Sequence, residues 1–214
     1  MPNEAVYPNA SDGPALHAVI SLTNLLTQWE IRRDEIRLIA GHFALSTTEL
    51  LDAPFVTLSV LRPVVDRTLS YLRHQRKINE ADRHKTLDEI YDDPFRFDGL
   101  IRNHMTRMFS LGAEEMREGD GALTSVPDTA ERLERAKAGV AGLDAFGLQP
   151  RFDEFWTDLA ARYDLDQFAS VVSNTTEPED APDSLIDRIL HDNAHDVELY
   201  AFAETLYNER RNQS

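Results

Sequence analysis

The sequence predicts an α/β fold in which a small parallel sheet is flanked by many helices. Two short apolar runs, residues 36–40 and 55–61, read as strands, and a third run lies near 143–148. Helical patterns separate these runs, and strands that alternate with helices form parallel sheets that bind ligands beyond the carboxyl ends of the strands. His42 and Arg62 each follow one of the first two strands. A functional site is therefore expected at that edge of the sheet.

The helices follow from apolar spacing and from their end signals. After a loose lead-in, apolar side chains recur at i, i+3 and i+4, and the last of these patterns forms a long stripe. Asp128 with Glu131 three residues later predicts a capping box, and Gly119 and Gly121 predict the end of the helix before it. We expect helices at residues 15–33, 64–78, within 79–95, and at 97–118, 128–138, 152–163 and 183–211.

The composition and net charge of the chain limit the classes of protein to which it can belong. The chain has 214 residues, enough for one buried domain over 1–214, and a formal net charge of −16 argues against nucleic-acid binding. It has no cysteine, which excludes disulfides, and no apolar stretch approaches the roughly 20 residues of a membrane span. The N-terminus lacks the basic and apolar regions of a secretory signal. These features predict a cytoplasmic protein without a membrane span.

The segment around Arg62 has the layout of an anion site. The second strand delivers Arg62 to its end, and the helix that follows points its first backbone N–H groups toward the same place. A guanidinium adds a full charge and a planar fork of donors that suits phosphate. Ser70 lies about two turns into that helix and shares a face with Asp66. The alternative is an arginine that merely pairs with a surface carboxylate.

Residues 61–70 also resemble a known motif. Leu61, Arg62 and Ser70, with the Val-Asp-Arg between them, are in register with Leu-Arg-Asp-Pro-Val-Glu-Arg-x-x-Ser-x-Tyr, while Pro63 and Val64 depart from it. This motif belongs to sulfotransferases related to heparan sulfate 2-O- and 6-O-sulfotransferases. The resemblance implies a P-loop-like sulfotransferase fold in which Arg62 and Ser70 hold the 3′-phosphate of 3′-phosphoadenosine 5′-phosphosulfate (PAPS).

His42 is the candidate catalytic base. An imidazole has an ordinary pKa of about 6.5 and accepts a proton near neutral pH. The step Gly41-His42-Phe43 resembles the Gly-His step that supplies the catalytic histidine in the same family. A histidine at a strand end is also often a hydrogen-bonded structural group, and the sequence leaves both interpretations open.

Three further segments resemble the same family. Asn103, Thr106 and Arg107 resemble an Asn-x-x-Thr-Arg segment that borders the acceptor cleft in this family. The resemblance implies that Asn103 and Arg107 bind substrate. The alternative is that these polar side chains lie on a solvent-facing helix surface. The loop with Asn174 and Thr176 resembles one that folds over the nucleotide. The run from Asp196 to Ala203 resembles the terminal Asp-x-Glu-Leu-Tyr-x-Phe-Ala helix, with a packing role.

One part of the family pattern is not found. These sulfotransferases open with a strand and a Pro-Lys-Thr-x-(Gly/Ala)-Thr-Ser loop for the 5′-phosphosulfate, whereas the early loop Ser11-Asp12-Gly13-Pro14 is acidic and has no lysine. We therefore expect the first strand and the phosphosulfate loop to be absent from this chain. It would then be either truncated, with a misassigned start as one cause, or a degenerate member of the family, and weakly active or inactive by itself. No metal is expected, because His191 and His195 lie four residues apart without a third ligand by motif.

Together these features predict a sulfotransferase that moves a sulfuryl group from PAPS to a hydroxyl of a carbohydrate or small-molecule acceptor. The alternative is a non-catalytic nucleotide-binding or scaffold protein that retains the sulfotransferase fold. A P-loop kinase is disfavoured because the sequence has no Gly-x-x-x-x-Gly-Lys-Ser/Thr motif.

Overall fold

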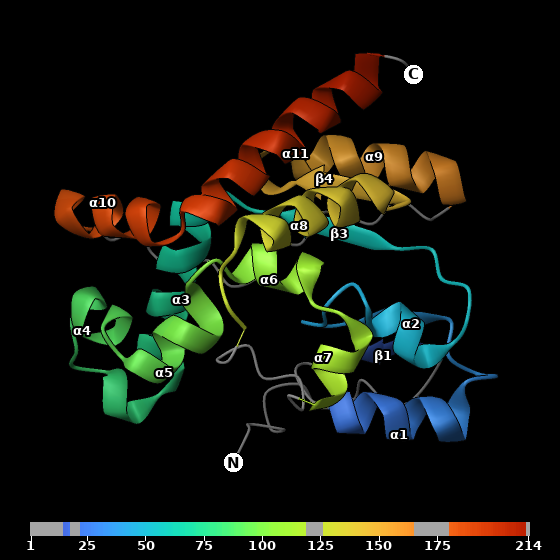
Figure 1. Ribbon diagram of the computed structural model, residues 1–214, viewed down its shortest axis with the longest axis horizontal. Helices are drawn as coiled ribbons and strands as arrows, with labels where there is room; N and C mark the ends of the chain where they lie inside the picture. Colours follow the sequence, from blue (N-terminus) through green and yellow to red (C-terminus); the bar gives the residue numbers. More distant parts are fainter. Residues whose placement is uncertain (1–14, 18–21, 119–125, 165–179, 213–214) are drawn as a thin grey trace. The chain divides into compact units, whose positions relative to one another are not determined.

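The computed structural model describes residues 15–17, 22–118, 126–164 and 180–212 (Figure 1). The chain divides into two compact units. Unit 1 comprises Met1–Phe55 with Ser110–Ala122, and unit 2 comprises Val56–Phe109 with Leu123–Ser214. Most described residues are helical, and the strands pair in parallel, which confirms the α/β class. The single domain over 1–214 stays a prediction.

Unit 1 is built around a short parallel strand pair. Strand β1 (Ala15–His17) pairs with β2 (Leu38–Ala40), and the helices are α1 (Leu22–Arg32), α2 (Thr47–Leu51) and α7 (Ala113–Glu118). The helix expected from residue 15 therefore starts only at Leu22. Over so few residues an apolar strand and the first turn of an apolar helix give the same sequence pattern, so the pairing with β2 decides the outcome.

The core of unit 1 lies between α1, the strand segment and α2. Leu25, Ile36 and Leu51 are buried together, and Trp29 packs against them. The Trp29 indole Nε1 donates to the Leu51 carbonyl oxygen at 3.0 Å, so the polar edge of this large ring is satisfied within the core. This bond ties α1 to the end of α2.

Unit 2 contains a second parallel strand pair. Strand β3 (Leu58–Leu61) pairs with β4 (Ala145–Leu148), with Leu58 opposite Ala145 and Leu61 opposite Leu148. The described strands thus form two sheets of two strands, and the strand before His42 and the strand before Arg62 belong to different sheets. The helical elements of unit 2 are α3 (Val64–Ile78), η2 (Glu80–Asp82), α4 (Leu87–Tyr91), α5 (Pro94–Arg96), the single π turn η3 (Phe97–Ile101), α6 (His104–Ser110), α8 (Ala130–Gly142), η4 (Gln149–Arg151), α9 (Phe152–Tyr163), α10 (Asp183–Asp192) and α11 (Ala194–Asn212).

Two predicted long helices are each broken at an asparagine. The helix expected over 97–118 is divided into η3, α6 and α7, and Asn103, just before α6, has a left-handed φ of 44°. The helix expected over 183–211 is divided into α10 and α11 at Asn193, which ends α10. Asparagine tolerates the left-handed conformation seen at Asn103 better than most residues, so a continuous apolar pattern does not exclude a break there.

The capping box predicted at Asp128 is wrong. Helix α8 begins at Ala130, and the side chain of Thr129 caps it by accepting a hydrogen bond from the Arg132 backbone N–H at 3.2 Å. The Asp128 carboxylate is instead bonded to two arginines of unit 2, Arg102 and Arg107.

The C-terminal helix is fixed to β4 through an aromatic side chain. Tyr207 of α11 meets Phe146 of β4 edge to face with 6.0 Å between ring centroids. The Arg151 guanidinium carbon lies 4.7 Å from the centroid of the Tyr207 ring, an effective distance for a cation–π contact. Figure 1 shows β4 between α9 and α11.

Helix α9 packs directly against β4 because residue 147 is a glycine. A Cβ atom at Gly147 would lie 2.4 Å from Cγ and 2.8 Å from Cβ of the buried Phe155. Those atoms are close to the α9 backbone and cannot move aside without shifting the helix. The sheet that leads to Arg62 therefore depends on close approach of α9.

Gly147→Ala is expected to lower the free energy of unfolding by about 2 kcal/mol, because it overpacks this contact. The melting temperature should fall by roughly 5 °C in a thermal unfolding scan. Gly142→Ala is the matched control, because a Cβ at Gly142 would meet no atom within 4 Å. Equal melting temperatures for the two variants would contradict the packing described for α9.

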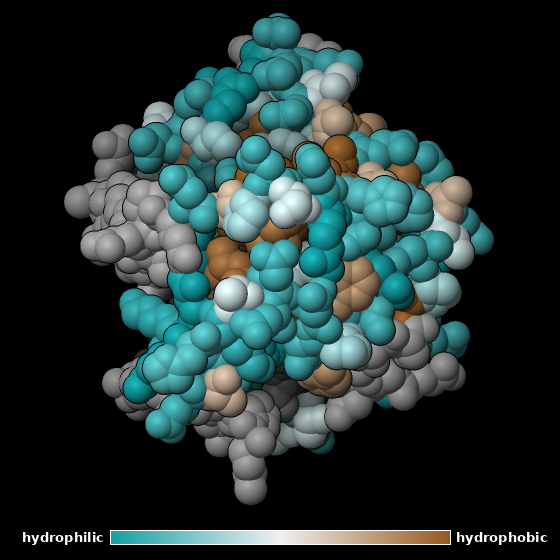
Figure 2. Space-filling view, turned by 90° about the vertical axis from the view of Figure 1, so that its left-hand side faces the viewer, coloured by the Kyte–Doolittle hydropathy of each residue, from teal (hydrophilic) through white to brown (hydrophobic). Residues whose placement is uncertain are grey.

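The surface drawn in Figure 2 is mainly hydrophilic, and hydrophobic side chains gather on it only in small groups. Within the described ranges, no helix combines the length and the apolar character that crossing a membrane requires.

Candidate functional site

The candidate site lies at the N-terminal end of α3, directly after β3. Arg62 follows the last residue of β3, and α3 begins at Val64 with no side chain capping it. The first hydrogen bond of the helix runs from the Arg67 N–H to the Pro63 carbonyl oxygen at 2.9 Å. The backbone N–H groups before Arg67 therefore have no acceptor within the helix and carry its partial positive charge.

Arg62 adds a half-buried guanidinium to this helix end. Its Nε atom is enclosed by the protein and has no hydrogen-bond partner among the described residues. An enclosed donor without an acceptor costs about 1–3 kcal/mol. The arrangement favours an acceptor from outside the described residues, and an anion is the strongest one for a guanidinium.

Arg67 brings a second guanidinium close to the first. It is half-buried in the first turns of α3 and donates from Nη2 to the Leu100 carbonyl oxygen at 2.9 Å. Burial lowers the pKa of Arg67, the buried carboxylate of Asp196 acts in the opposite direction, and the positive charge of Arg62 lowers it further. The charge of Arg62 thus disfavours the charged form of Arg67, while the carboxylate of Asp196 favours it more strongly.

Ser70 lies further along the same helix, on the side that bears the exposed Asp66 four residues earlier. It is half-buried. Helix α3 spans Val64–Ile78 as predicted, so the spacing of Arg62 and Ser70 across its start is as expected. Whether both groups contact one phosphate stays a prediction.

His42 is in a different compact unit from α3. It belongs to unit 1, follows β2 and is exposed in the bend that precedes α2. Its role as the base stays a prediction. Asn174 and Thr176 lie outside the described residues.

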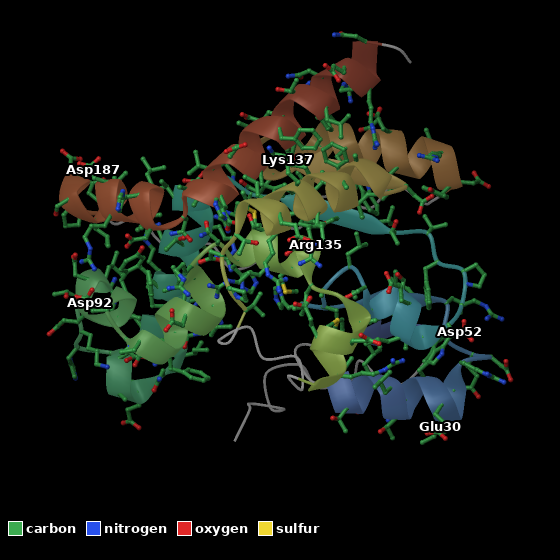
Figure 3. All side chains as sticks on the ribbon, in the orientation of Figure 1. Glu30, Asp52, Asp92, Arg135, Lys137 and Asp187 are labelled. Carbon is green, nitrogen blue, oxygen red and sulfur yellow. The ribbon has the colours of Figure 1, made fainter. Side chains whose placement is uncertain are left out.

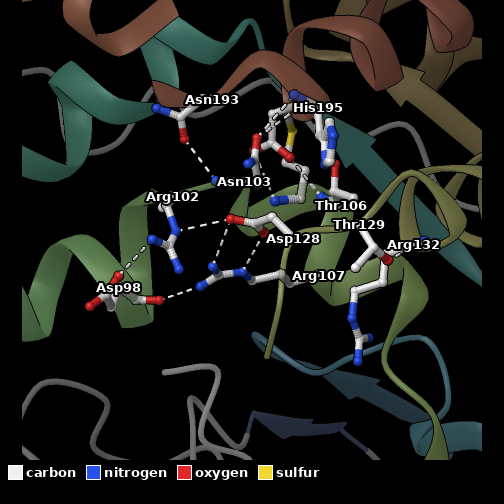
Figure 4. Close-up of polar contacts among 12 residues, drawn as sticks. Asp98, Arg102, Asn103, Thr106, Arg107, Asp128, Thr129, Arg132, Asn193 and His195 are labelled. Carbon is white, nitrogen blue, oxygen red and sulfur yellow. Dashed lines mark hydrogen bonds and ion pairs between the residues drawn. The ribbon is translucent and has the colours of Figure 1, made fainter. Parts of the chain in front are cut away.

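Asn103 takes part in a buried network that joins α6 to α11 (Figure 4). Its side-chain Oδ1 accepts hydrogen bonds from the His195 and Asp196 backbone N–H groups at 3.1 and 3.2 Å, near the start of α11. Its own N–H donates to Asn193 Oδ1 at 2.9 Å. Asn103 thus caps α11, and its left-handed conformation turns the chain into α6.

Asp196 provides the reciprocal cap. It is fully buried, and its two carboxylate oxygens accept from the Met105 N–H at 3.0 Å and the Thr106 N–H at 2.7 Å. These are the second and third residues of α6. Each of the two helices therefore receives its N-terminal acceptor from the other.

Arg107 lies in a second buried contact of unit 2. Only 1% of its surface is exposed, and Nε and Nη2 donate to the two Asp128 oxygens at 3.0 Å each. A further Arg107 donor bonds to the Asp98 carbonyl oxygen, and Arg102 pairs with the same Asp128 at 2.9 Å. The structure therefore engages both Asn103 and Arg107 in helix capping and ion pairing, and their contact with an acceptor stays a prediction.

Sequence reasoning named Arg67 and Asp196 only as members of family motifs and proposed neither as a site residue. Asp196 occupies the same stripe of α11 as the buried Leu199, Ala203 and Tyr207. A carboxylate within an apolar stripe is a signal of a buried acceptor, because a charge is seldom buried without partners. The identity of those partners depends on tertiary structure.

The described ranges contain no group of three or more His, Cys, Asp or Glu side chains arranged to hold a metal ion. No known family model matches this chain, and no curated protein matches it.

Proposed function

We propose that this protein is a PAPS-dependent sulfotransferase that binds the 3′-phosphate of the nucleotide at the head of α3. The observation that carries the proposal is the Arg62 guanidinium, whose enclosed Nε has no partner in the described part of the chain, next to an uncapped helix start. Phosphate is the ligand that satisfies both features, because it accepts from guanidinium and from helix N–H groups together. The resemblance of residues 61–70 to the sulfotransferase motif selects the nucleotide among phosphate ligands.

The proposed reaction moves one sulfuryl group. The hydroxyl oxygen of a carbohydrate or small-molecule acceptor attacks the sulfur of PAPS, and the bond between sulfur and the 5′-phosphate oxygen breaks. The acceptor proton passes to a base, for which His42 is the candidate by resemblance. The products are a sulfate ester and adenosine 3′,5′-bisphosphate, so no oxidant or reductant is needed.

The test is isothermal titration of the full chain with adenosine 3′,5′-bisphosphate. Arg62→Ala is expected to weaken binding at least roughly tenfold, because it removes a charge-assisted contact worth about 1.5–3 kcal/mol. Arg135→Ala is the control, since Arg135 is an exposed arginine of α8 that carries the same charge (Figure 3). Equal binding by wild type and Arg62→Ala would refute the nucleotide site.

Activity separates the enzyme from the non-catalytic alternative. Nucleotide binding that depends on Arg62, with no transfer of labelled sulfate from PAPS to any tested hydroxyl acceptor, would favour a binding or scaffold protein. Transfer that is lost in His42→Ala, while adenosine 3′,5′-bisphosphate still binds, would support His42 as the base.

A further inference from the structure

Strand β3 has one edge paired with β4 and one open edge. The Ala145 N–H donates to the Thr57 carbonyl oxygen at 3.3 Å, and the register sets Leu58 opposite Ala145. Backbone groups alternate in direction along a strand, so Thr57 and every second residue after it face β4, whereas Leu58 and Val60 face away. Within the described residues β3 has no second strand partner. The N–H and C=O groups of Leu58 and Val60 are therefore available to a further strand.

The side chains along this open edge are apolar and exposed. Leu58 and Val60 are 43% and 40% exposed, and Val56, two residues earlier, is 56% exposed. Paired residues of neighbouring strands point to the same face of a sheet, and Val60 lies opposite Gly147, where α9 packs. Helix α9 therefore covers this face over β4 and leaves much of it open over β3. Parallel sheets are buried on both faces in most proteins, so the open strip is a candidate docking surface.

The open edge leads to a positively charged group. Strand β3 ends at Leu61, and Arg62 follows directly before the uncapped start of α3. The Arg62 Nε has no hydrogen-bond partner among the described residues. The carboxyl ends of parallel strands meet at the same edge of a sheet, so a strand added in parallel to β3 would end beside Arg62. A carboxylate at that end would complement the guanidinium and the first N–H groups of α3.

We propose that the open edge of β3 binds an extended peptide in parallel, with apolar side chains at alternate positions and a carboxylate at Arg62. Such strand addition draws affinity from main-chain hydrogen bonds and specificity from alternate side chains. A second copy of this chain fits less well, because each partner of a stable interface buries about 800 Å² and this strip has three exposed side chains. The inference goes beyond sulfuryl transfer and shares only Arg62 with the proposed nucleotide site.

The first experiment titrates the full chain with the synthetic peptide acetyl-Lys-Thr-Val-Thr-Val-Thr-Val, ending either in a free carboxylate or in an amide. The carboxylate form is expected to bind roughly tenfold more tightly, because amidation removes a charge-assisted contact. Arg62→Ala should abolish the difference between the two forms. Arg135→Ala, at an exposed arginine of α8, should preserve it. A difference that persists in Arg62→Ala, or that is absent in wild type, would overturn the proposed contact with the carboxylate.

N-methylated peptides test the strand pairing itself. In a parallel pair only every second residue of the peptide turns its N–H toward β3. Methylating the nitrogens of all the valines or of all the threonines should therefore weaken binding at least tenfold in one peptide and be tolerated in the other. This comparison leaves the protein unchanged, so folding does not affect it. Equal affinities of the two methylated peptides would overturn the proposal.

A proline variant tests the same edge from the side of the protein. Val60→Pro removes an N–H that faces away from β4, a position at which a strand tolerates proline. Peptide binding should weaken at least tenfold, and the melting temperature should stay near that of wild type. Ser59→Pro is the matched control, because it removes an N–H that faces β4 and should lower the melting temperature. Unchanged peptide binding by a folded Val60→Pro variant would contradict the pairing.

Hydrogen exchange distinguishes a free edge from one that is already covered. The Leu58 and Val60 amides should exchange rapidly in the free chain and become protected when the peptide is added. The Ser59 and Leu61 amides face β4 and should be protected in both states. Protection of Leu58 and Val60 without peptide would overturn the proposal, and sedimentation would then show whether a second copy covers the edge. Peptide binding without any binding of adenosine 3′,5′-bisphosphate would defeat only the proposed function.

Discussion

Asp196→Ala is expected to lower the free energy of unfolding by about 4 kcal/mol, which corresponds to a fall in melting temperature of roughly 10 °C. The substitution leaves the buried N–H groups of Met105 and Thr106 without acceptors. It also removes the carboxylate that attracts Arg67. Removing one partner from a buried set of charges is far more damaging than removing a surface ion pair.

The matched control is Glu198→Ala in the same helix. The Glu198 side chain is 59% exposed and pairs with Lys137 at 2.7 Å, so its loss should change stability by less than about 1 kcal/mol. Chemical denaturation followed by circular dichroism measures both variants. Similar losses for Asp196→Ala and Glu198→Ala would show that the reciprocal caps contribute little.

The buried Asp196 carboxyl should also make the free energy of unfolding depend on pH. Burial raises the pKa of Asp196, and Arg67 with the two backbone N–H groups acts in the opposite direction. Because the folded pKa lies above the unfolded value of about 3.9, the folded state binds more protons between the two values. The contribution of this group to stability is therefore largest below about pH 4 and is lost as pH rises through the folded pKa. Asp196→Asn should remove that part of the pH profile.

Arg107→Ala is the second substitution with a large expected effect, a loss of about 3 kcal/mol. The side chain is buried and holds Asp128 with two parallel hydrogen bonds, so alanine leaves a cavity and weakens the pairing of a partly buried carboxylate. Arg107→Lys should recover only part of the loss, because an ammonium cannot form the two-pronged contact. Unfolding curves of the two variants measure the difference.

Arg107 also allows the acceptor-binding prediction to be tested separately. If Arg107 serves only the fold, Arg107→Lys should leave the affinity for adenosine 3′,5′-bisphosphate and the KM for any accepted hydroxyl substrate at wild-type values. A raised KM in a well-folded Arg107→Lys variant would support a contact with the acceptor. A loss in Arg107→Ala no larger than that of exposed Arg135→Ala would contradict the structural role.

The spacing of apolar residues correctly predicted helices and strands that depend mainly on interactions between neighbours in the sequence. Helix α3 begins directly after Pro63 and α9 spans 152–163, both as expected, because each has an uninterrupted amphipathic pattern. Strand β4 lies within the expected run near 143–148. For the same reason Arg62 could be predicted as an anion-binding residue, because the end of a strand and the start of a helix adjoin it in the sequence.

The remaining features depend on residues far apart in the chain. The breaks at Asn103 and Asn193 are set by hydrogen bonds between segments about 90 residues apart, which no pattern within either helix contains. Asp128 satisfied the rule for a helix cap, yet the arginines of the preceding elements bind it and Thr129 takes its place. The relation of Arg67 to Asp196 likewise appears only once α3 and α11 are packed.

The exchange of caps between α6 and α11 has a consequence during synthesis on the ribosome. Asp196 lies 91 positions after Met105, whose N–H it accepts. A nascent chain that has not yet emerged past residue 196 contains all of α6 but not the carboxylate that completes its first turn. A premature stop codon between positions 110 and 196 would therefore damage a helix that had already been translated in full.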